Sequence, residues 1–445
     1  MKKAQSWRVV LGAGGGLLLS LAGSVGAAPN EQFIPFPNFR VGPLAGIGLG
    51  VTGGQLDYMT MINERDGGIN GVKITWEECE FEYKVDRGLE CYERLKRKGP
   101  TGASLINPLN TGVTYALTER TVVDKIPMIT MGQARSDTAD GRVFPYIFPL
   151  ITSYWSGDTT MIRFIGQREG GMDKLKGKKI AFVYHGSPFG RESLPIFDTL
   201  SKKHGFELIP IEVAPPGTEQ QAQWLQIRQH KPDWVIMRTL GVMTPGALKA
   251  AQKVGYPADR IVGMWWATAE DEVGAAGEAA RGYIGNNFIP VGSSYPVLQE
   301  LIKRYYSGGK KGYLDDVKRV GGVSYNAGVV QAILNLEGIR VAQRKYGKRP
   351  LTGEQVRWGL ENIVMDDKRI KQLGAVGLIQ PMKTSCFDHE GGGATKYQQW
   401  DGGKWVVISD WIQPDRALVR KLVEESAAKY AKEKNITPRD CSKES

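Results

Sequence analysis

Short apolar runs alternate with longer amphipathic segments over much of the chain. Such an alternation is typical of βαβ units, in which helices connect parallel strands. The runs that predict strands are residues 73–76, 104–107, 128–130, 179–184, 207–213 and 234–238. Amphipathic helices are predicted over residues 54–64, 84–97, 113–125, 193–204, 220–229 and 245–254. The pattern therefore predicts the α/β fold class.

The same pattern begins again after residues 151–158, as expected where one α/β unit ends and a similar one starts. We therefore expect two Rossmann-like lobes. Nearer the C-terminus, an Asp-Gly-Gly turn inside residues 397–407 predicts a β-hairpin, and residues 417–434 predict a terminal helix.

Residues 1–27 predict a secretory signal peptide. Lys2, Lys3 and Arg8 precede an apolar, glycine-rich stretch, and small residues at 25–27 suit cleavage. The apolar stretch is shorter than the ~20 residues of a membrane-spanning helix, and no later stretch is long and apolar enough. We therefore expect the mature chain to begin near residue 28 and to be located in the periplasm.

The composition is ordinary for a globular protein, with 41% hydrophobic and 24% charged residues. A formal net charge of +11 raises the hypothesis of a nucleic-acid partner. However, the 58 Lys and Arg residues are scattered among 47 acidic ones, and three positive charges lie in the predicted signal peptide. The charges favour a solvated surface, and we expect no nucleic-acid partner.

The four cysteines are Cys79, Cys91, Cys386 and Cys441, an even number that favours disulfides in an exported chain. Spacing alone allows three pairings. Cys79 with Cys91 is favoured because the loop between them is short, and it leaves Cys386 with Cys441 to hold the C-terminal tail. Zinc is the alternative, but the sequence has no CxxC and its histidines stand apart from the cysteines, so no metal site is expected.

Sequence signatures of enzymes are few. Residues 46–50 show a GxGxG pattern that does not continue as the GxGxxG of a dinucleotide-binding turn, and no GxxxxGK[ST] phosphate loop is present. His185 stands two residues before Ser187, but without a GxSxG motif or an evident acidic partner. We therefore predict no catalytic residue and no cofactor.

Several motifs carry a resemblance to a known family. Residues 67–74 read GGINGVKI with a cysteine soon after, and residues 126–130 read IPMIT. SPFG, KAAQKVGY and FD follow at residues 187–190, 249–256 and 387–388. In their order, from about residue 39 to residue 408, these motifs resemble the type I periplasmic solute-binding proteins of the branched-chain amino acid ABC transporter family.

The resemblance implies two α/β lobes joined by three crossing strands, with a ligand cleft between the lobes. Residues 28–150 and about 288–378 would form lobe 1, and residues 151–287 and about 379–445 would form lobe 2 with the hairpin and tail. The implied role is to trap a small-molecule ligand by hinge closure and deliver it to a membrane permease powered by an ATPase. The protein would act as a monomer, without catalysis.

The family's motif positions also imply the ligand-binding residues. In that family, backbone and hydroxyl groups of the first lobe hold the ligand carboxylate, and here they fall at Asn110, Thr111, Thr114, Gly132, Gln133 and Ala134. A capping turn is the alternative role for the first of these segments. Arg135 and Arg238 follow strands and can bind a carboxylate through two hydrogen bonds, although most arginines are surface residues. Phe189 stands at the family's aromatic wall, and Tyr154 or Trp155 can face the same cleft from the lobe junction.

Trp265 and Trp266, in the segment GMWWAT, depart from the family pattern. Amino-acid-binding members place an acidic residue here against the ammonium group of the ligand. Without that residue a buried ammonium is unpaired, which is costly, unless a shifted loop brings in Glu270 or Asp271. Adjacent tryptophans are more often core, but at this position at least one is expected to line the cleft. We therefore expect a small carboxylate, aromatic or lignin-derived, rather than a free branched-chain amino acid.

Two other functional classes stay open from the sequence. A ligand-sensing protein of the same fold would signal its closure to a membrane receptor. The sequence does not distinguish such a protein from a transporter component. An exported α/β enzyme is the third class, less favoured because the sequence shows no nucleophile, base or metal constellation.

Overall fold

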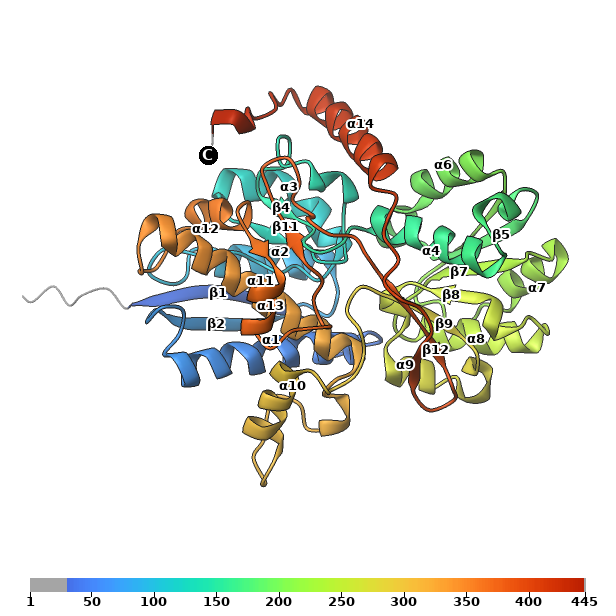
Figure 1. Cartoon of the computed structure of the whole chain (residues 1–445), viewed down its shortest axis with the longest axis horizontal. Helices are drawn as coiled ribbons and strands as arrows, with labels where there is room; N and C mark the ends of the chain where they lie inside the picture. Colours follow the sequence, from blue (N-terminus) through green and yellow to red (C-terminus); the bar gives the residue numbers. More distant parts are fainter. Residues whose placement is uncertain (1–29, 444–445) are drawn as a thin grey trace, which may run out of the picture.

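The computed structural model describes residues 30–443, so the predicted signal peptide lies outside the described residues. Two α/β lobes stand side by side (Figure 1). Blue and orange elements, far apart in the sequence, share one lobe, while green and yellow elements form the other. The α/β fold with two lobes is therefore confirmed.

The first lobe is built on short parallel strands. β1 (Glu31–Asn38) pairs with β2 (Lys73–Glu80), and β3 (Met128–Ile129) pairs with β4 (Ile147–Phe148). Residues 104–107 lie between these pairs, because Ser104 N–H donates to Phe33 O and Ile106 bridges to Met128. The helices of this lobe are α1 (Ala45–Asp66), α2 (Val85–Leu95), α3 (Thr111–Asp124), α10 (Pro296–Leu301), α11 (Val323–Tyr346), α12 (Gly353–Leu360) and α13 (Asp367–Gln372).

The second lobe contains a seven-stranded sheet in the order β13-β12-β9-β8-β7-β5-β6. Its parallel strands are β5 (Lys179–His185), β6 (Glu207–Val213), β7 (Trp234–Arg238), β8 (Ile261–Gly263) and β9 (Ile284–Asn287). The hairpin β12 (Lys396–Trp400) and β13 (Trp405–Val407) adds two antiparallel strands at the edge. The helices of this lobe are α4 (Tyr154–Arg168), α5 (Pro188–Arg191), α6 (Leu194–His204), α7 (Gln221–His230), α8 (Met243–Lys253) and α9 (Glu270–Gly274).

Most predicted elements are confirmed, and β6 and β7 have the predicted bounds. Among the elements that the pattern did not predict are β1, β8, β9, α4 and α11. β8 has three residues, and β9 reads IGNN, whose two asparagines are buried polar residues. α11 is buried along most of its length, so its apolar residues form no single stripe.

The glycine-rich segment at residues 46–50 lies in α1 and serves helix packing. A Cβ on Gly50 would crowd Ser324, and one on Gly54 would clash with the Tyr325 carbonyl. On the other helix, α11, a Cβ on Gly328 would clash with the Val51 carbonyl of α1. The backbones of α1 and α11 therefore approach closely, which only glycine permits at these positions.

Three segments connect the lobes: residues 149–153 between β4 and α4, residues 288–295 between β9 and α10, and residues 384–395 between β11 and β12. β11 (Met382–Lys383) pairs antiparallel with β10 (Val364–Met365), before the last crossing. The predicted residue boundaries of the lobes, including the one near residue 379, stay predictions.

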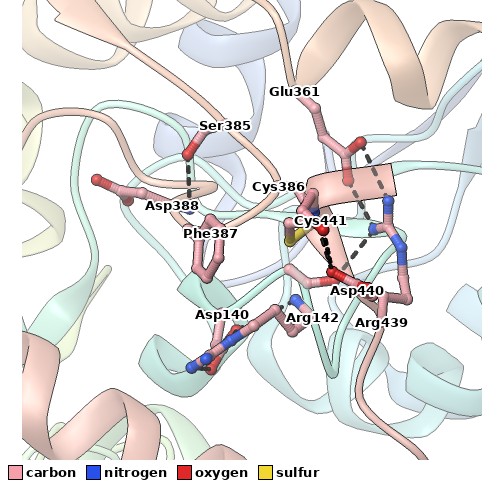
Figure 2. The surroundings of a disulfide bond; sticks show 12 residues. Asp140, Arg142, Glu361, Ser385, Cys386, Phe387, Asp388, Arg439, Asp440 and Cys441 are labelled. Atoms are coloured by element: carbon pink, nitrogen blue, oxygen red, sulfur yellow. Dashed lines mark hydrogen bonds and ion pairs between the residues drawn. A yellow bond between two sulfur atoms is a disulfide. The ribbon is translucent and has the colours of Figure 1, made fainter. Parts of the chain in front are cut away.

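The C-terminal helix α14 (Arg416–Lys434) runs from the second lobe back to the first (Figure 1). Asp415, at its start, donates its N–H to Thr159 of α4 at 3.0 Å, and Ser426 donates to Asp137 of the first lobe at 2.9 Å. Beyond the helix, the Cys386–Cys441 disulfide ties down the tail, and Arg439 pairs with Glu361 at 2.7 Å (Figure 2).

Both disulfides have the favoured pairing, Cys79 with Cys91 and Cys386 with Cys441. Within residues 30–443, no group of three or more His, Cys, Asp or Glu side chains is placed to hold a metal ion. In the same range, no helix combines the length and the apolar character needed to cross a membrane.

Candidate functional site

A small cavity of about 20 Å³ lies where the two lobes meet. Its walls are mainly aromatic and aliphatic, with two polar side chains, and among the described residues that line it none carries a formal charge. The lining residues are Phe39, Ile47, Val51, Tyr83, Leu109, Thr111, Gln133, Tyr154, Leu240 and Trp266. The cavity is therefore an apolar space with a few polar groups, as small-molecule sites usually are.

The N-terminus of α3 forms one polar wall. Asn110 caps the helix, since its Oδ1 accepts from Val113 N–H at 2.9 Å while its Nδ2 donates to Tyr83 O at 3.0 Å. Thr114 donates its hydroxyl to Asn110 O at 3.1 Å. Asn110 and Thr114 therefore build the turn, and Thr111, the first residue of the helix, lines the cavity. The positive end of a helix is a favourable place for an anion.

The loop after β3 forms the second polar wall. Gly132 and Ala134 have φ values of 62° and 66°, and this turn directs the side chain between them, that of Gln133, to the cavity. Gln133 is 3% exposed, and its Nε2 has no hydrogen-bond partner among the described residues. A buried amide donor without a partner is costly, and a ligand oxygen would satisfy it.

Arg135 does not line the cavity. Its guanidinium forms two hydrogen bonds with the Asp137 carboxylate, at 3.0 and 2.8 Å, and lies over the Tyr430 ring at 4.4 Å. Arg135 therefore donates to Asp137 the two hydrogen bonds that were predicted to hold a ligand carboxylate.

Arg238 has an equivalent partner. It is 1% exposed, pairs with Asp158 at 3.0 Å, and donates to Phe189 O at 3.3 Å. Its guanidinium lies 4.1 Å from the centre of the Tyr154 ring, so it supports this cavity-lining ring from behind. Burial raises the pKa of the Tyr154 hydroxyl well above its usual range, so this hydroxyl stays protonated and can donate.

The two tryptophans differ in their surroundings. Trp265 is 2% exposed, stacks on Tyr154 at 5.7 Å and meets the Phe288 ring edge-on at 5.0 Å. Trp266 is partly exposed and lines the cavity. Both indole N–H groups donate to the carbonyl of Gly132, at 2.7 and 2.9 Å, and so connect the second lobe to the loop after β3 in the first.

Other predicted residues lie just outside the cavity. Phe189 meets the Tyr154 ring edge-on at 5.8 Å, and Trp155 donates its Nε1–H to Glu192 O at 2.9 Å. Glu270 accepts from Val323 N–H, and Asp271 pairs with Arg319 at 2.5 Å. Neither acid lines the cavity, so neither supplies a partner for a ligand ammonium group there.

The sequence of this chain matches a family model. A family model described as periplasmic binding protein matches residues 31–404. The chain belongs to the periplasmic binding protein family. Among curated protein sequences, none matches this periplasmic binding protein.

Solved structures extend the comparison. One described as an ABC transporter permease from the Pseudomonas fluorescens group is 50% identical with a TM-score of 0.87, covering 93% of this chain and 100% of that one. A branched-chain amino acid ABC transporter from Thermus thermophilus with bound valine is 20% identical, with a TM-score of 0.73 and coverage of 89% and 99%. A solute-binding protein of an ABC transporter from R. palustris, in complex with benzoate, is 19% identical, with a TM-score of 0.65 and coverage of 86% and 97%. The last two show a shared fold.

The structure brings four of the predicted residues of this periplasmic binding protein to the cavity: Thr111, Gln133, Tyr154 and Trp266. The sequence reasoning missed the six apolar and aromatic ones, namely Phe39, Ile47, Val51, Tyr83, Leu109 and Leu240. Phe39 follows β1 and Leu240 follows β7, so the rule that ligands bind beyond the carboxyl ends of parallel strands could have found them. Ile47 and Val51 lie inside α1, and no local signal marks them.

Proposed function

We propose that this protein is the substrate-binding component of an ABC importer, and that it closes its lobes around a small carboxylate with an aromatic or apolar body. After export to the periplasm and removal of residues 1–27, it acts as a monomer without catalysis. It delivers the ligand to a membrane permease that is driven by an ATPase. The observation that carries this proposal is the interlobe cavity, whose walls are mainly apolar and include two unlike polar side chains, Thr111 and Gln133.

The two polar side chains of the cavity suit a carboxylate. Thr111, at the first turn of α3, offers a hydroxyl near the positive end of the helix, and the unpartnered Nε2 of Gln133 offers a second donor. Neutral donors of this kind stabilise an anion without a full counter-charge. The Arg135 and Arg238 guanidiniums are already paired, so the carboxylate is held by these neutral groups.

The rest of the cavity suits an aromatic or apolar body. Tyr154 and Trp266 offer ring faces or edges, and aliphatic side chains from α1 close the space. An α-amino acid would place its ammonium in this cavity without an acidic partner, at a cost of several kcal/mol. The proposal therefore favours carboxylates without an ammonium group, such as benzoate, over valine or leucine.

Matched ligand pairs test this function in thermal-shift and calorimetric titrations of the mature protein. 3-Phenylpropanoate and phenylalanine differ by the ammonium group, and benzoate and benzamide differ by the negative charge. We expect benzoate and 3-phenylpropanoate to raise the melting temperature, because a ligand that binds only the folded state stabilises it. Phenylalanine, valine and benzamide should have a much smaller effect. A response to phenylalanine or valine alone would contradict the proposal.

Substitutions of the two polar residues that line the cavity test where the ligand carboxylate binds. Gln133→Ala and Thr111→Val should each weaken benzoate binding about tenfold, since a hydrogen bond to a charged group contributes roughly 1.5–3 kcal/mol. Gln372→Ala is the matched control, because Gln372 is exposed on α13, away from the cavity. Unchanged affinity in both wall variants would place the carboxylate elsewhere.

A further inference from the structure

Glu192 of the second lobe bonds to the first lobe beside the cavity. It directly follows α5, and its Oε1 accepts the backbone N–H of Ser136 at 2.7 Å. Its other carboxylate oxygen accepts the hydroxyl of Tyr115. Tyr115 lies one turn beyond Thr111 in α3, the helix whose first residue lines the cavity. Glu192 therefore connects the lobes on the α3 side.

Glu270 makes a second connection on the opposite wall. It is the first residue of α9, and both of its carboxylate oxygens accept the backbone N–H of Val323, at 3.1 and 3.2 Å. Val323 begins α11, which packs closely along α1, and Ile47 and Val51 of α1 line the cavity. Glu270 therefore connects the lobes on the α1 side and caps a helix of the first lobe.

We propose that Glu192 and Glu270 are positioning residues that hold the two lobes closed over the bound ligand, one on each side of the cavity. This inference rests on the proposed function, because closure is the step that traps the ligand. Neither carboxylate touches the cavity, so each acts on ligand retention through the lobe–lobe contact. Opening the cleft breaks both connections and returns both carboxyl groups to water.

The surroundings of these carboxyl groups make closure sensitive to pH. Burial, with Asp137 nearby, raises the pKa of Glu192 from 4.5 to about 7. Arg135 also faces Glu192, but it is paired with Asp137. Burial, with Asp271 nearby, raises the pKa of Glu270 from 4.5 to about 7.

Further charged groups stand near Glu270, and Asp316 and Lys318 line the same pocket as Glu270. Arg319 pairs with Asp271, and the Glu272 carboxyl lies against the backbone of Gly241 in its own lobe. Burial raises the pKa of Glu272 as well, to about 8, but its backbone partner belongs to the same lobe, so Glu272 does not connect the lobes. In the open form the pKa of each connecting glutamate falls back toward its ordinary value. The closed form thus binds more protons, so closure strengthens as pH falls through about 7 and weakens above it.

The test measures closure with and without a ligand, at pH 5.5 and pH 8.5. Small-angle scattering of the ligand-free mature protein reports the separation of the lobes, and stopped-flow dissociation of benzoate reports retention. We expect a smaller radius of gyration at pH 5.5 and benzoate dissociation at least about tenfold slower than at pH 8.5, because both glutamates bind a proton more tightly in the closed form. Benzoate stays ionised at both values, so the ligand does not contribute to the change.

Two double variants separate the roles of geometry and charge. E192Q/E270Q keeps an acceptor oxygen at each site but does not titrate, so it should stay closed at both pH values. E192A/E270A loses both connections and should be open, with fast benzoate dissociation, at both. Thermal melts check that each variant is folded.

Glu390→Gln is the matched control. Burial raises the pKa of Glu390 to about 7 as well, but its carboxyl accepts Ser153 N–H at 2.7 Å, between two lobe-connecting segments that stay together. E390Q should therefore keep the wild-type pH response. A pH response that survives in E192Q/E270Q, or wild-type closure in E192A/E270A, overturns the proposal. If benzoate does not bind, the proposed ligand fails, and the scattering of the ligand-free protein still decides the role of the two glutamates.

Discussion

The neighbouring residues Trp265 and Trp266 differ in burial and therefore in their expected roles. Trp265 packs between Tyr154 and Phe288 and is 2% exposed, whereas Trp266 is partly exposed and forms a wall of the cavity. Their indole N–H groups share one acceptor, the Gly132 carbonyl. Substitutions should therefore separate stability from binding.

Trp265→Ala should lower the free energy of unfolding by about 3–5 kcal/mol, because a large buried ring leaves a cavity. Trp266→Ala should cost less stability but weaken benzoate binding about tenfold, through loss of a ring contact. Denaturant unfolding and calorimetric titration measure the two effects. Trp266→Phe keeps a ring without the N–H and serves as control; equal stability losses at both positions would contradict this division.

At the scale of single residues, the sequence predicted Thr111 and Gln133, one of Tyr154 and Trp155, and at least one of Trp265 and Trp266. The cavity is lined by Thr111, Gln133, Tyr154 and Trp266. Arg135 and Arg238 were expected to face a ligand, yet Asp137 and Asp158 bind them. Asp137 is only two residues from Arg135, but Asp158 is eighty residues from Arg238. A partner at that distance along the chain is set by the fold.

At the scale of elements, the contact between α1 and α11 controls one wall of the cavity. Gly50, Gly54 and Gly328 allow close approach of the two backbones, and α1 carries Ile47 and Val51 into the cavity wall. Any separation of the two helices therefore displaces that wall.

Gly54→Ala should destabilise the protein by about 1–3 kcal/mol, because its Cβ meets the Tyr325 carbonyl and forces the helices apart. Gly46→Ala is the control in the same helix, since a Cβ there has nothing within 4 Å. We expect Gly46→Ala to be neutral or slightly stabilising, as alanine favours helix. Chemical unfolding of both variants checks the prediction, which fails if they behave alike.

The element pattern was predictable where a strand or helix has one buried face. α11 was not, because it is buried along most of its length, and its partner α1 is nearly three hundred residues away in sequence. The glycines of α1 are evident in the sequence, but their function in packing could not be predicted. They lie against the backbone of α11, and only the fold brings that helix next to α1.

At the scale of the whole molecule, α14 and the tail bridge both lobes outside the three connecting segments. The helix starts at α4 and contacts Asp137 midway, and the tail beyond it is held by the Cys386–Cys441 disulfide. This arrangement connects the loop after β3 in the first lobe, through Asp137 and Arg135, to a helix that begins on the second.

Removing the Cys386–Cys441 bond with serines should cost more stability than removing Cys79–Cys91, about 4 against about 3 kcal/mol, because the closed loops span 55 and 12 residues. Amide exchange should also rise in the last turns of α14 and in the tail. The Cys79→Ser/Cys91→Ser variant is the control for loss of a disulfide as such. Unchanged exchange in α14 after loss of Cys386–Cys441 would show that packing alone holds it.

The sequence by itself determined the α/β class, the repeat of the pattern after residue 151, the disulfide preference and the turn residues at the strand ends. Each of these depends on local spacing, which period and turn chemistry control. Only the tertiary structure decided which tryptophan faces the cavity, which acids pair with Arg135 and Arg238, and where Glu192 and Glu270 bond. Those contacts join segments from different parts of the chain, and burial and hydrogen bonding select among partners that spacing leaves equivalent.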